Sequence, residues 1–411
     1  MNWKHVSLGE ISVNIQTGPF GSQLHQSDYS EKGTPVVMPK DLISGHISEE
    51  SIARVSDDHV ERLSRHKIEV GDILYSRRGD VGRCAFASET EAGWLCGTGC
   101  LRVTIDSRKA NPKFVFYQLL KADTIGWVEK HAVGSTMLNL NTSILSSVPI
   151  DLPSHDKQNH IVGVLSAYDD LIENNQKQIK LLEEAAQRLY KEWFVDLRFP
   201  GHETTPIVDG VPEGWTYKPF SEVFDYVRGK SYTSKELSDT TGILMANLKN
   251  IRAFGGYNRN AEKRFTGQYK ANQMLYAGDI VMGVTDMTQE RRLVGHVALV
   301  PDLGEKMTFS MDLIKIIPQL TDNLFLYSAM YYGGLSKQIS PLANGVNVLH
   351  LKPEAMMGIE MLIPTKDILE RYHQQFAPMV TRIEALQKQC DVAAEARDRL
   401  IPKLMNREIE V

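Results

Sequence analysis

Cysteine is scarce in this sequence of 411 residues, which holds only Cys84, Cys96, Cys100 and Cys390. Four scattered cysteines are too few for a disulfide framework. The paired CxxC spacing of a zinc site is also missing, so we expect free, buried thiols of the kind that intracellular proteins carry.

Long apolar runs are absent as well. No stretch approaches the roughly 20 apolar residues that span a bilayer. The first residues, Met1 to His5, lack the basic-then-apolar order of a secretion signal. These two absences predict a cytoplasmic protein with no membrane contact.

An excess of positive charge is missing too, because the formal net charge is −5. Residues 1–150 carry 16 basic and 17 acidic side chains, and residues 201–364 carry the same numbers. A surface that grips a polyanion must therefore be a local cluster of charge, with part of the grip supplied by a partner protein.

Enzyme motifs are also lacking. Gly97-Thr98-Gly99 has no third glycine at the spacing of a cofactor turn, and there is no Pro-Pro dipeptide of the kind found in adenine methyltransferases. Gly229-Lys230-Ser231 mimics the end of a phosphate-binding loop, but Phe224 stands where its first glycine is required. The histidines show no HxH or HxxxH spacing. We expect no catalytic residue, no metal ligand and no cofactor in this chain.

What the sequence does contain is an internal repeat. A shift of 211 residues superimposes Gly134-x3-Leu138-x-Leu140 on Gly345-x3-Leu349-x-Leu351 without a gap. Between residues 172 and 189, nine of eighteen positions are identical to their partners 211 residues later. Such self-similarity predicts that one architecture is built twice, in the order globular unit, helix, globular unit, helix.

Each globular unit reads as mixed α and β. Short β-branched or aromatic runs, such as 72–75, 101–105 and 313–317, are separated by Gly-, Asp- and Asn-rich turns. One helix in each unit is predicted, at 113–122 and 324–332. Rigid strands would then display variable polar loops.

The segments between the units have a heptad pattern. Apolar residues alternate by four and three in two series, Ile161, Leu165, Tyr168, Ile172, Asn175, Ile179, Leu182, Ala186, Leu189 and Trp193, and Tyr372, Phe376, Met379, Ile383, Leu386, Cys390, Ala393, Leu400 and Leu404, with Arg397 interrupting the second. This seam predicts a coiled coil, formed either within the chain as an antiparallel pair or between two chains. We expect Pro378 to kink or restart the second helix and Pro402 to end its regular part.

At these helices the sequence resembles a known family. The run Asp170-Leu171-Ile172-Glu173-Asn174-Asn175, then Glu192-Trp193-Phe194 and Arg198-Phe199-Pro200-Gly201, resembles the central region of type I restriction-modification specificity subunits. The segments 211–215 and 71–79 resemble target-recognition domains of that family. The likeness extends over essentially the whole chain. It departs in the second copy, which has Gly283-Val284-Thr285-Asp286 in place of the Arg-Arg-Gly run.

The resemblance implies an α+β fold with pseudo-twofold internal duplication. Two target-recognition domains, residues 1–153 and 201–364, would be separated by two long antiparallel helices in the family's shared helical regions, 154–200 and 365–411. Each domain would read one half of a bipartite, asymmetric site in double-stranded DNA. The partners implied are two methyltransferase subunits, which use S-adenosylmethionine, and restriction subunits, which use ATP and Mg²⁺.

Base reading calls for Arg or Lys at guanine and for Asn or Gln at adenine, presented on loops. The candidates in the first domain are Gly18, Phe20, Gly21, Ser22, Gln23, Lys40, Arg77, Arg78, Ser135 and Thr136. Those in the second are Arg228, Lys230, Ser231, Tyr232, Asn247, Lys249, Asn250, Thr285, Arg291, Arg292, Asn344 and Asn347. The adjacent pairs Arg77–Arg78 and Arg291–Arg292 suit phosphate anchoring better than base reading.

The apolar residues at the helix ends admit two interpretations. Trp193, Phe194 and Phe199, with Leu404 and Met405 at the corresponding place in the second copy, form either core or a patch that docks a methyltransferase subunit. The competing function for the whole chain is a coiled-coil scaffold that binds only proteins, which its near-neutral domains would suit.

Overall fold

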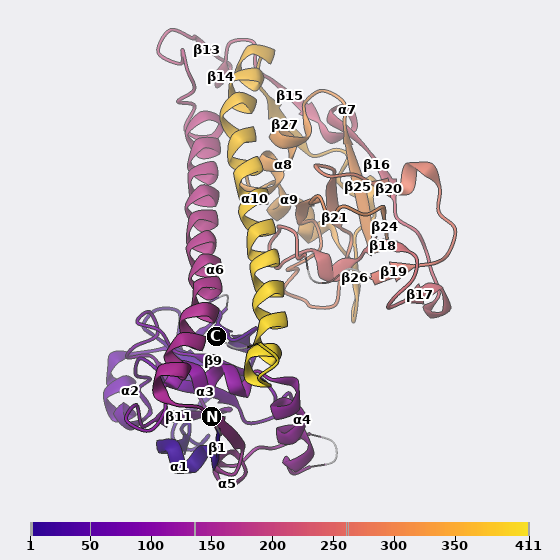
Figure 1. Ribbon diagram of the computed structural model, residues 1–411. Helices are drawn as coiled ribbons and strands as arrows, with labels where there is room; N and C mark the ends of the chain where they lie inside the picture. Colours follow the sequence, from indigo (N-terminus) through magenta and orange to yellow (C-terminus); the bar gives the residue numbers. More distant parts are fainter. Residues whose placement is uncertain (1–2, 50, 135–136, 260, 262, 410–411) are drawn as a thin grey trace. The chain divides into compact units, whose positions relative to one another are not determined.

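The computed structural model describes residues 3–49, 51–134, 137–259, 261 and 263–409, and Figure 1 traces the chain. It divides into two compact units. Unit 1 comprises residues 1–173 and 391–411, and unit 2 comprises residues 174–390. Each unit thus combines one globular part with a portion of both long helices.

Unit 1 is built on two four-stranded sheets. The first is antiparallel and has the order β2-β11-β8-β9, from Ser12–Thr17, Cys100–Ile105, Ile73–Ser76 and Cys84–Phe86. The second has the order β10-β4-β7-β3, from Leu95–Cys96, Thr34–Val37, Ala53–Val55 and Tyr29–Ser30, with β10 and β4 parallel. Every residue of β8 is buried, as expected for the apolar run Ile-Leu-Tyr of a central strand.

Unit 2 repeats this plan. Its antiparallel sheet has the order β16-β25-β21-β23, from Phe224–Arg228, Leu313–Pro318, Ile280–Gly283 and Val297–Leu299. Its second sheet has the order β17-β19-β18-β24-β20, from Leu237–Ser238, Lys263–Phe265, Ile243–Ala246, Met307–Phe309 and Met274–Leu275, and β18 and β24 are again parallel. The predicted duplication and mixed α and β composition are confirmed.

Smaller pairs complete the sheets. They are β1 (Lys4–Ser7) with β12 (Pro149–Leu152), β5 (Leu42–Ile43) with β6 (His46–Ile47), β13 (Ile207–Val208) with β14 (Val211–Pro212), β15 (Thr216–Pro219) with β27 (Glu360–Ile363), and β22 (Thr285–Asp286) with β26 (Leu349–His350). The short helices are α1 (Leu8–Ile11), α2 (Asp57–Arg62), α4 (Ala122–His131), α5 (Thr142–Ser146), α7 (Phe220–Val223) and α9 (Leu335–Ile339). The described residues contain no helix long and apolar enough to cross a membrane.

One buried helix in each unit occupies equivalent positions. The helix α3 (Pro112–Leu119) is capped by the side chain of Asn111, which accepts hydrogen bonds from the backbone N–H groups of residues 113 and 114. The helix α8 (Asn323–Tyr331) is capped by Asp322, which lies 211 residues after Asn111 and accepts from the N–H of Phe325. The repeat therefore preserves the N-cap chemistry that starts this helix, and both helices lie where the sequence predicts them.

Two long helices, α6 (His155–Tyr190) and α10 (Lys366–Met405), carry the heptad seam. Within unit 2 they lie side by side and antiparallel (Figure 1). Asn175 donates to Gln389, Arg382 donates to Gln178, and the ring of Tyr190 contacts Tyr372, so residue numbers rise along one helix as they fall along the other. Of the two pairings that the seam allowed, the structure has the one within the chain.

Neither of the two prolines in α10 interrupts the helix. The helix does not restart at Pro378, and Pro402 does not end it, because α10 continues to Met405. Each proline removes one intrahelical hydrogen bond. Both lie on the exposed face, as do Gln374 and Asp398, the residues whose carbonyls lose a partner. Water can satisfy those carbonyls, so the helix tolerates both prolines.

Candidate nucleic-acid interface

In unit 1, the ends of three strands meet at one edge of the first sheet. The strand β11 is antiparallel to both β2 and β8, so its first residue lies beside their last residues. Gly18 N–H donates to Cys100 O at 2.9 Å, and Arg77 N–H donates to Gly99 O at 2.9 Å. The loops 18–24, 77–83 and 97–99 therefore lie together.

A fourth loop, 133–140, joins the same edge. Gly79 N–H donates to Leu138 O at 3.0 Å, and Leu140 N–H donates to Arg77 O at 2.8 Å. Gly134 has a φ of 124°, and a Cβ there would lie 2.3 Å from Met137 O. The glycine of the repeated motif is thus required by a tight turn. We call these four loops the loop edge of unit 1.

The loop edge of unit 1 brings together several predicted residues. The guanidinium of Arg77 lies over the ring of Phe20, 5.9 Å from its centroid. The carbonyl of Gln23's side chain accepts from Phe20 N–H at 3.0 Å and fixes the tip of the loop. Gly18 is buried, and a Cβ at this position would lie 1.9 Å from Gly97 O.

The remaining candidates of unit 1 are spread more widely. Gly21, Ser22 and Arg78 are exposed at the loop edge. Lys40 follows β4 in a short 3-10 turn and donates from Nζ to Ser51 O at 2.8 Å. Ser135 and Thr136 lie outside the described residues.

Unit 2 forms the equivalent edge from the loops 229–233, 284–293, 310–312 and 344–350. Gly229 N–H donates to Leu313 O, Val284 N–H to Asp312 O and Leu351 N–H to Val284 O. Gly345 repeats the role of Gly134, since its φ is 152° and a Cβ would lie 1.9 Å from Val348 O. We call these four loops the loop edge of unit 2.

Four candidates in unit 2 are already engaged inside the domain. Arg228 donates to Glu354 Oε1 at 2.7 Å and stacks on Tyr226. Asn247 and Asn250 are buried, and their amides hold the segment 247–261 through Lys249 N–H, Ala261 O and Asn258 O. Thr285 is buried beside His350. In this conformation the three buried side chains offer no group to a base edge, and Arg228 is neutralised.

The other candidates in unit 2 remain accessible to varying degrees. Ser231, Lys249, Arg292, Asn344 and Asn347 are exposed, and Lys230, Tyr232 and Arg291 are half-buried. Arg292 is ion-paired with Glu290. Arg291 has a φ of 51°, and its Nε is buried without a hydrogen-bond partner.

Apart from Phe20, sequence reasoning missed the apolar side chains of both loop edges. Phe20 is 53% exposed and Met137 63% at the first, and Met287, Met311 and Val346 are exposed at the second, Val346 to 88%. Exposed apolar side chains of this kind mark interaction surfaces, and in nucleic-acid recognition they contact thymine methyl groups or wedge between bases. The position of these side chains at loop tips is visible only in the fold.

It also missed the residue that shapes the 284–293 loop. Asp286 is buried and accepts from the N–H groups of Leu293, Thr288 and Val294. Burial alone would raise the pKa of Asp286, but these hydrogen bonds outweigh it and lower the pKa below its usual value. An Asp two residues before a Thr is a weak local signal for such a turn.

Four of the five aromatic and aliphatic residues at the helix ends lie in hydrophobic cores. Trp193 and Phe199 are buried with Tyr372 and Phe376 in unit 2, and Leu404 and Met405 are buried with Trp3 in unit 1. Only Phe194 keeps partial exposure. The structure thus favours the core interpretation, and little of these side chains is left for a partner.

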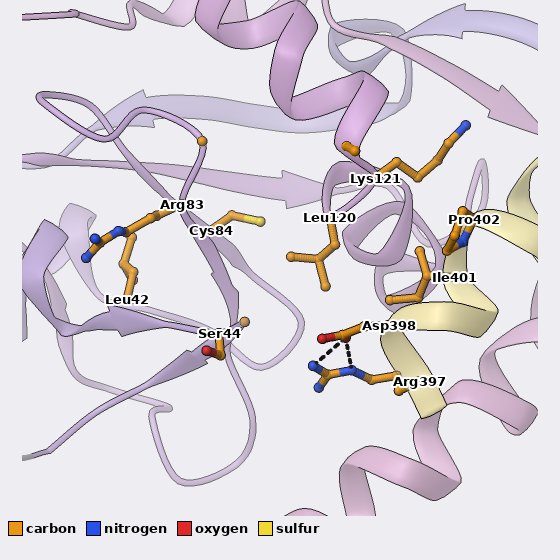
Figure 2. Close-up of a pocket in the computed structure, with 13 residues that line it drawn as sticks. Leu42, Ser44, Arg83, Cys84, Leu120, Lys121, Arg397, Asp398, Ile401 and Pro402 are labelled. Carbon is orange, nitrogen blue, oxygen red and sulfur yellow. Dashed lines mark hydrogen bonds and ion pairs between the residues drawn. The ribbon is translucent and has the colours of Figure 1, made fainter. Parts of the chain in front are cut away.

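A cavity of about 420 Å³ in unit 1 lies between the segments 42–45, 82–84 and 120–122 and the last turns of α10 (Figure 2). Its two arginines are already paired with carboxylates. Arg397 is bonded to Asp398 and Asp169, Arg83 to Asp80, and Lys121 is directed away from the Arg397–Asp398 pair. The loop edges remain the better candidate for a binding surface.

No set of three His, Cys, Asp or Glu side chains that could hold a metal ion occurs in the described part of the chain. The cysteines of unit 1 are buried and free, and burial raises the pKa of the Cys84 and Cys96 thiols to about 12. At neutral pH both remain protonated and poor as ligands or nucleophiles.

Comparison with known proteins points to one family, both from a domain match and from relatives that align over nearly the whole chain. Residues 1–184 match the family described as type I restriction modification DNA specificity domain. The MjaIX specificity subunit of Methanocaldococcus jannaschii is 27% identical over 92% of this chain and 87% of its own length. The HindI specificity subunit of Haemophilus influenzae is 22% identical over 99% of this chain and its full length. Residues 1–184 thus match this DNA specificity domain, and the chain as a whole is similar to type I restriction-modification specificity subunits.

The fold agrees with this similarity. The S subunit of a type I system from M. genitalium superimposes with a TM-score of 0.57, covering 98% of this chain and 96% of its own, at 14% identity. A specificity subunit is the non-catalytic member of its complex. The chain thus has the α+β architecture with two similar globular units and two long helices that its sequence predicts.

Proposed function

We propose that this chain is a specificity subunit that reads a bipartite DNA site, with the loop edge of each unit contacting one half-site. The observation that carries the proposal is that the same edge is built twice from different side chains. Arg77 and Arg78 of unit 1 correspond in hydrogen-bond pattern to Val284 and Thr285 of unit 2. Equal scaffolds with unequal loops suit an asymmetric sequence with two different halves.

The antiparallel helices would set the unread spacer between the half-sites and dock two methyltransferase subunits. Half-sites about one helical turn, roughly 34–36 Å, apart lie on one face of the duplex. S-adenosylmethionine would be bound by the methyltransferase subunits. ATP and Mg²⁺ would be used by restriction subunits where these are recruited.

Co-expression with the partner methyltransferase, followed by mapping of methylated adenines in the host genome, tests the proposal. A single split motif with one modified adenine on each strand is the expected result. A stable complex that leaves the DNA unmodified, and whose binding to duplexes shows no dependence on sequence, would favour the protein-only scaffold.

A further inference from the structure

Arg77 differs from most other arginines near the loop edges in having no acidic partner. Arg83 is ion-paired with Asp80, Arg228 with Glu354 and Arg292 with Glu290. For Arg77, the described residues supply only the ring of Phe20, and its Nε is buried without a hydrogen-bond partner. A buried donor left unsatisfied costs free energy, which a ligand acceptor can recover.

The Arg77 guanidinium is restricted in position, and its charge has no acidic partner among the described residues. Its Nε is buried, and its Cζ lies 5.9 Å from the centroid of the Phe20 ring, whose backbone N–H is bound by the Gln23 side chain. A phosphate anchor needs only a charge on a free stem, whereas the bidentate contact to guanine needs an oriented fork. Arg78, which is exposed, suits the phosphate role better.

Unit 2 has no equivalent of this pair. Gly229 corresponds to Gly18, since both come within 1.9 Å of a carbonyl if given a Cβ. Two residues further on, Ser231 stands in place of Phe20, and buried Val284 stands in place of Arg77. The two loop edges therefore differ in the one element that could read guanine by a stacked arginine.

Resting on the proposed function, we propose that Arg77 and Phe20 form a reading pair for the half-site of unit 1. Arg77 contacts O6 and N7 of a guanine, and Phe20 packs against the neighbouring base, where a thymine offers its C5-methyl group. Arg77 is thus a specificity-determining residue of one half-site only.

The test uses the intact complex with the methyltransferase subunits and duplexes that carry the mapped motif. Arg77→Met, which keeps the stem but loses the fork, is expected to lower discrimination at one guanine of one half-site by roughly 5- to 150-fold. Replacing that guanine by 7-deazaguanine should weaken wild-type binding and leave the variant unaffected. Replacing the adjacent thymine by uracil should weaken wild-type binding to a smaller extent and leave the Phe20→Ala variant unaffected.

Three controls keep the result interpretable. Arg108→Met makes the same change at an exposed arginine beyond the opposite end of β11 and should alter no base preference. Discrimination at the other half-site should survive in every variant, which shows that the chain is folded. Arg77→Lys should retain the charge and still lose discrimination, because it lacks the fork.

Several outcomes would overturn the inference. Uniform weakening over all sequences with a reduced salt slope would make Arg77 a phosphate anchor. A half-site of unit 1 without guanine, or an Arg77→Met complex with unchanged base preference, would also refute it. Absence of any split motif for the wild-type complex would instead refute the proposed function itself.

Discussion

At the scale of single residues, Gly134 and Gly345 show why the Gly-x3-Leu-x-Leu motif is repeated. Each turns the chain at a φ that favours glycine, and each lies against a carbonyl of its own loop. The buried leucines that follow, Leu140 and Leu351, tie the loop to the sheet edge. The repeated motif is therefore a support for variable side chains.

Gly134→Ala should strain the 133–140 loop, because the new Cβ meets Met137 O. We expect a loss of about 1–3 kcal/mol in stability and weaker binding at the half-site of unit 1 alone. Gly126→Ala is the matched control. Gly126 lies inside α4 with open space around it, so alanine should stabilise by about 0.5–1 kcal/mol. Thermal unfolding and half-site binding of both variants check this, and equal effects would contradict it.

His66 is the residue from which we expect a pH response. It is buried and accepts from Arg65 Nε at 3.0 Å, and burial together with Arg65 and Arg102 lowers its pKa to about 4. The unfolded chain takes up the proton near pH 6.5, but the folded chain does so only near pH 4, so stability falls as the pH drops between these values. The difference corresponds to about 3 kcal/mol.

His66→Gln keeps an acceptor for Arg65 and cannot titrate. Its unfolding free energy, measured by urea denaturation from pH 7 to pH 4, should gain about 3 kcal/mol relative to wild type as the pH falls. Carboxylates that titrate in both proteins cancel in this comparison. Parallel profiles for the two proteins would show that His66 takes up its proton at the same pH in the folded and the unfolded chain.

At the scale of elements, local periodicity decided what could be predicted. The heptad seam, the helices α3 and α8, and the strands β8, β11 and β25 follow from spacing and turn residues within a few positions. Pairings between distant segments could not be predicted. Glu354, which neutralises Arg228, lies 126 residues away, and the parallel pairs β4–β10 and β18–β24 join separate short strands. Which arginines stay free for a ligand therefore became visible only in the structure.

Arg397, which interrupts the heptad seam, is also paired with a residue far away in the sequence. Arg397 donates to Asp169 Oδ1 at 2.8 Å within unit 1, and Asp169 also accepts from Tyr117. The positions 211 residues away from Asp169 and Arg397 are Val380 and Ala186, so the repeat is apolar where the original is charged. A buried pair of this kind contributes more to the choice of register than to net stability.

Arg397→Met should therefore destabilise unit 1 by about 3–5 kcal/mol, because it leaves the Asp169 carboxylate buried without its main partner. Adding Asp169→Leu should restore a large part of that loss, since both positions are then apolar, as in the repeat. A double-mutant cycle followed by urea unfolding measures the coupling. Additive effects of the two changes would mean that the ion pair does not couple the helices.

At the scale of the whole molecule, the proposed function predicts that the length of the antiparallel pair sets the unread spacer, and this length can be changed without touching either loop edge. One heptad inserted after Gln176 in α6 and one after Gln387 in α10 would preserve the seam, because these exposed or half-buried positions correspond in the repeat. Seven residues lengthen a helix by about 10.5 Å. At 3.4 Å per base pair, that is about three base pairs.

The doubly extended subunit should methylate a motif with both half-site sequences unchanged and a spacer about three base pairs longer, at reduced efficiency because the half-sites are also rotated about the duplex. A heptad inserted in α6 alone is the control. It offsets the two seams by two helical turns and should abolish complex formation or specific methylation. Genome-wide mapping of methylated adenines measures the motif and spacer that each of the two variants methylates. An unchanged spacer in the doubly extended protein would show that something other than helix length sets the distance between the half-sites.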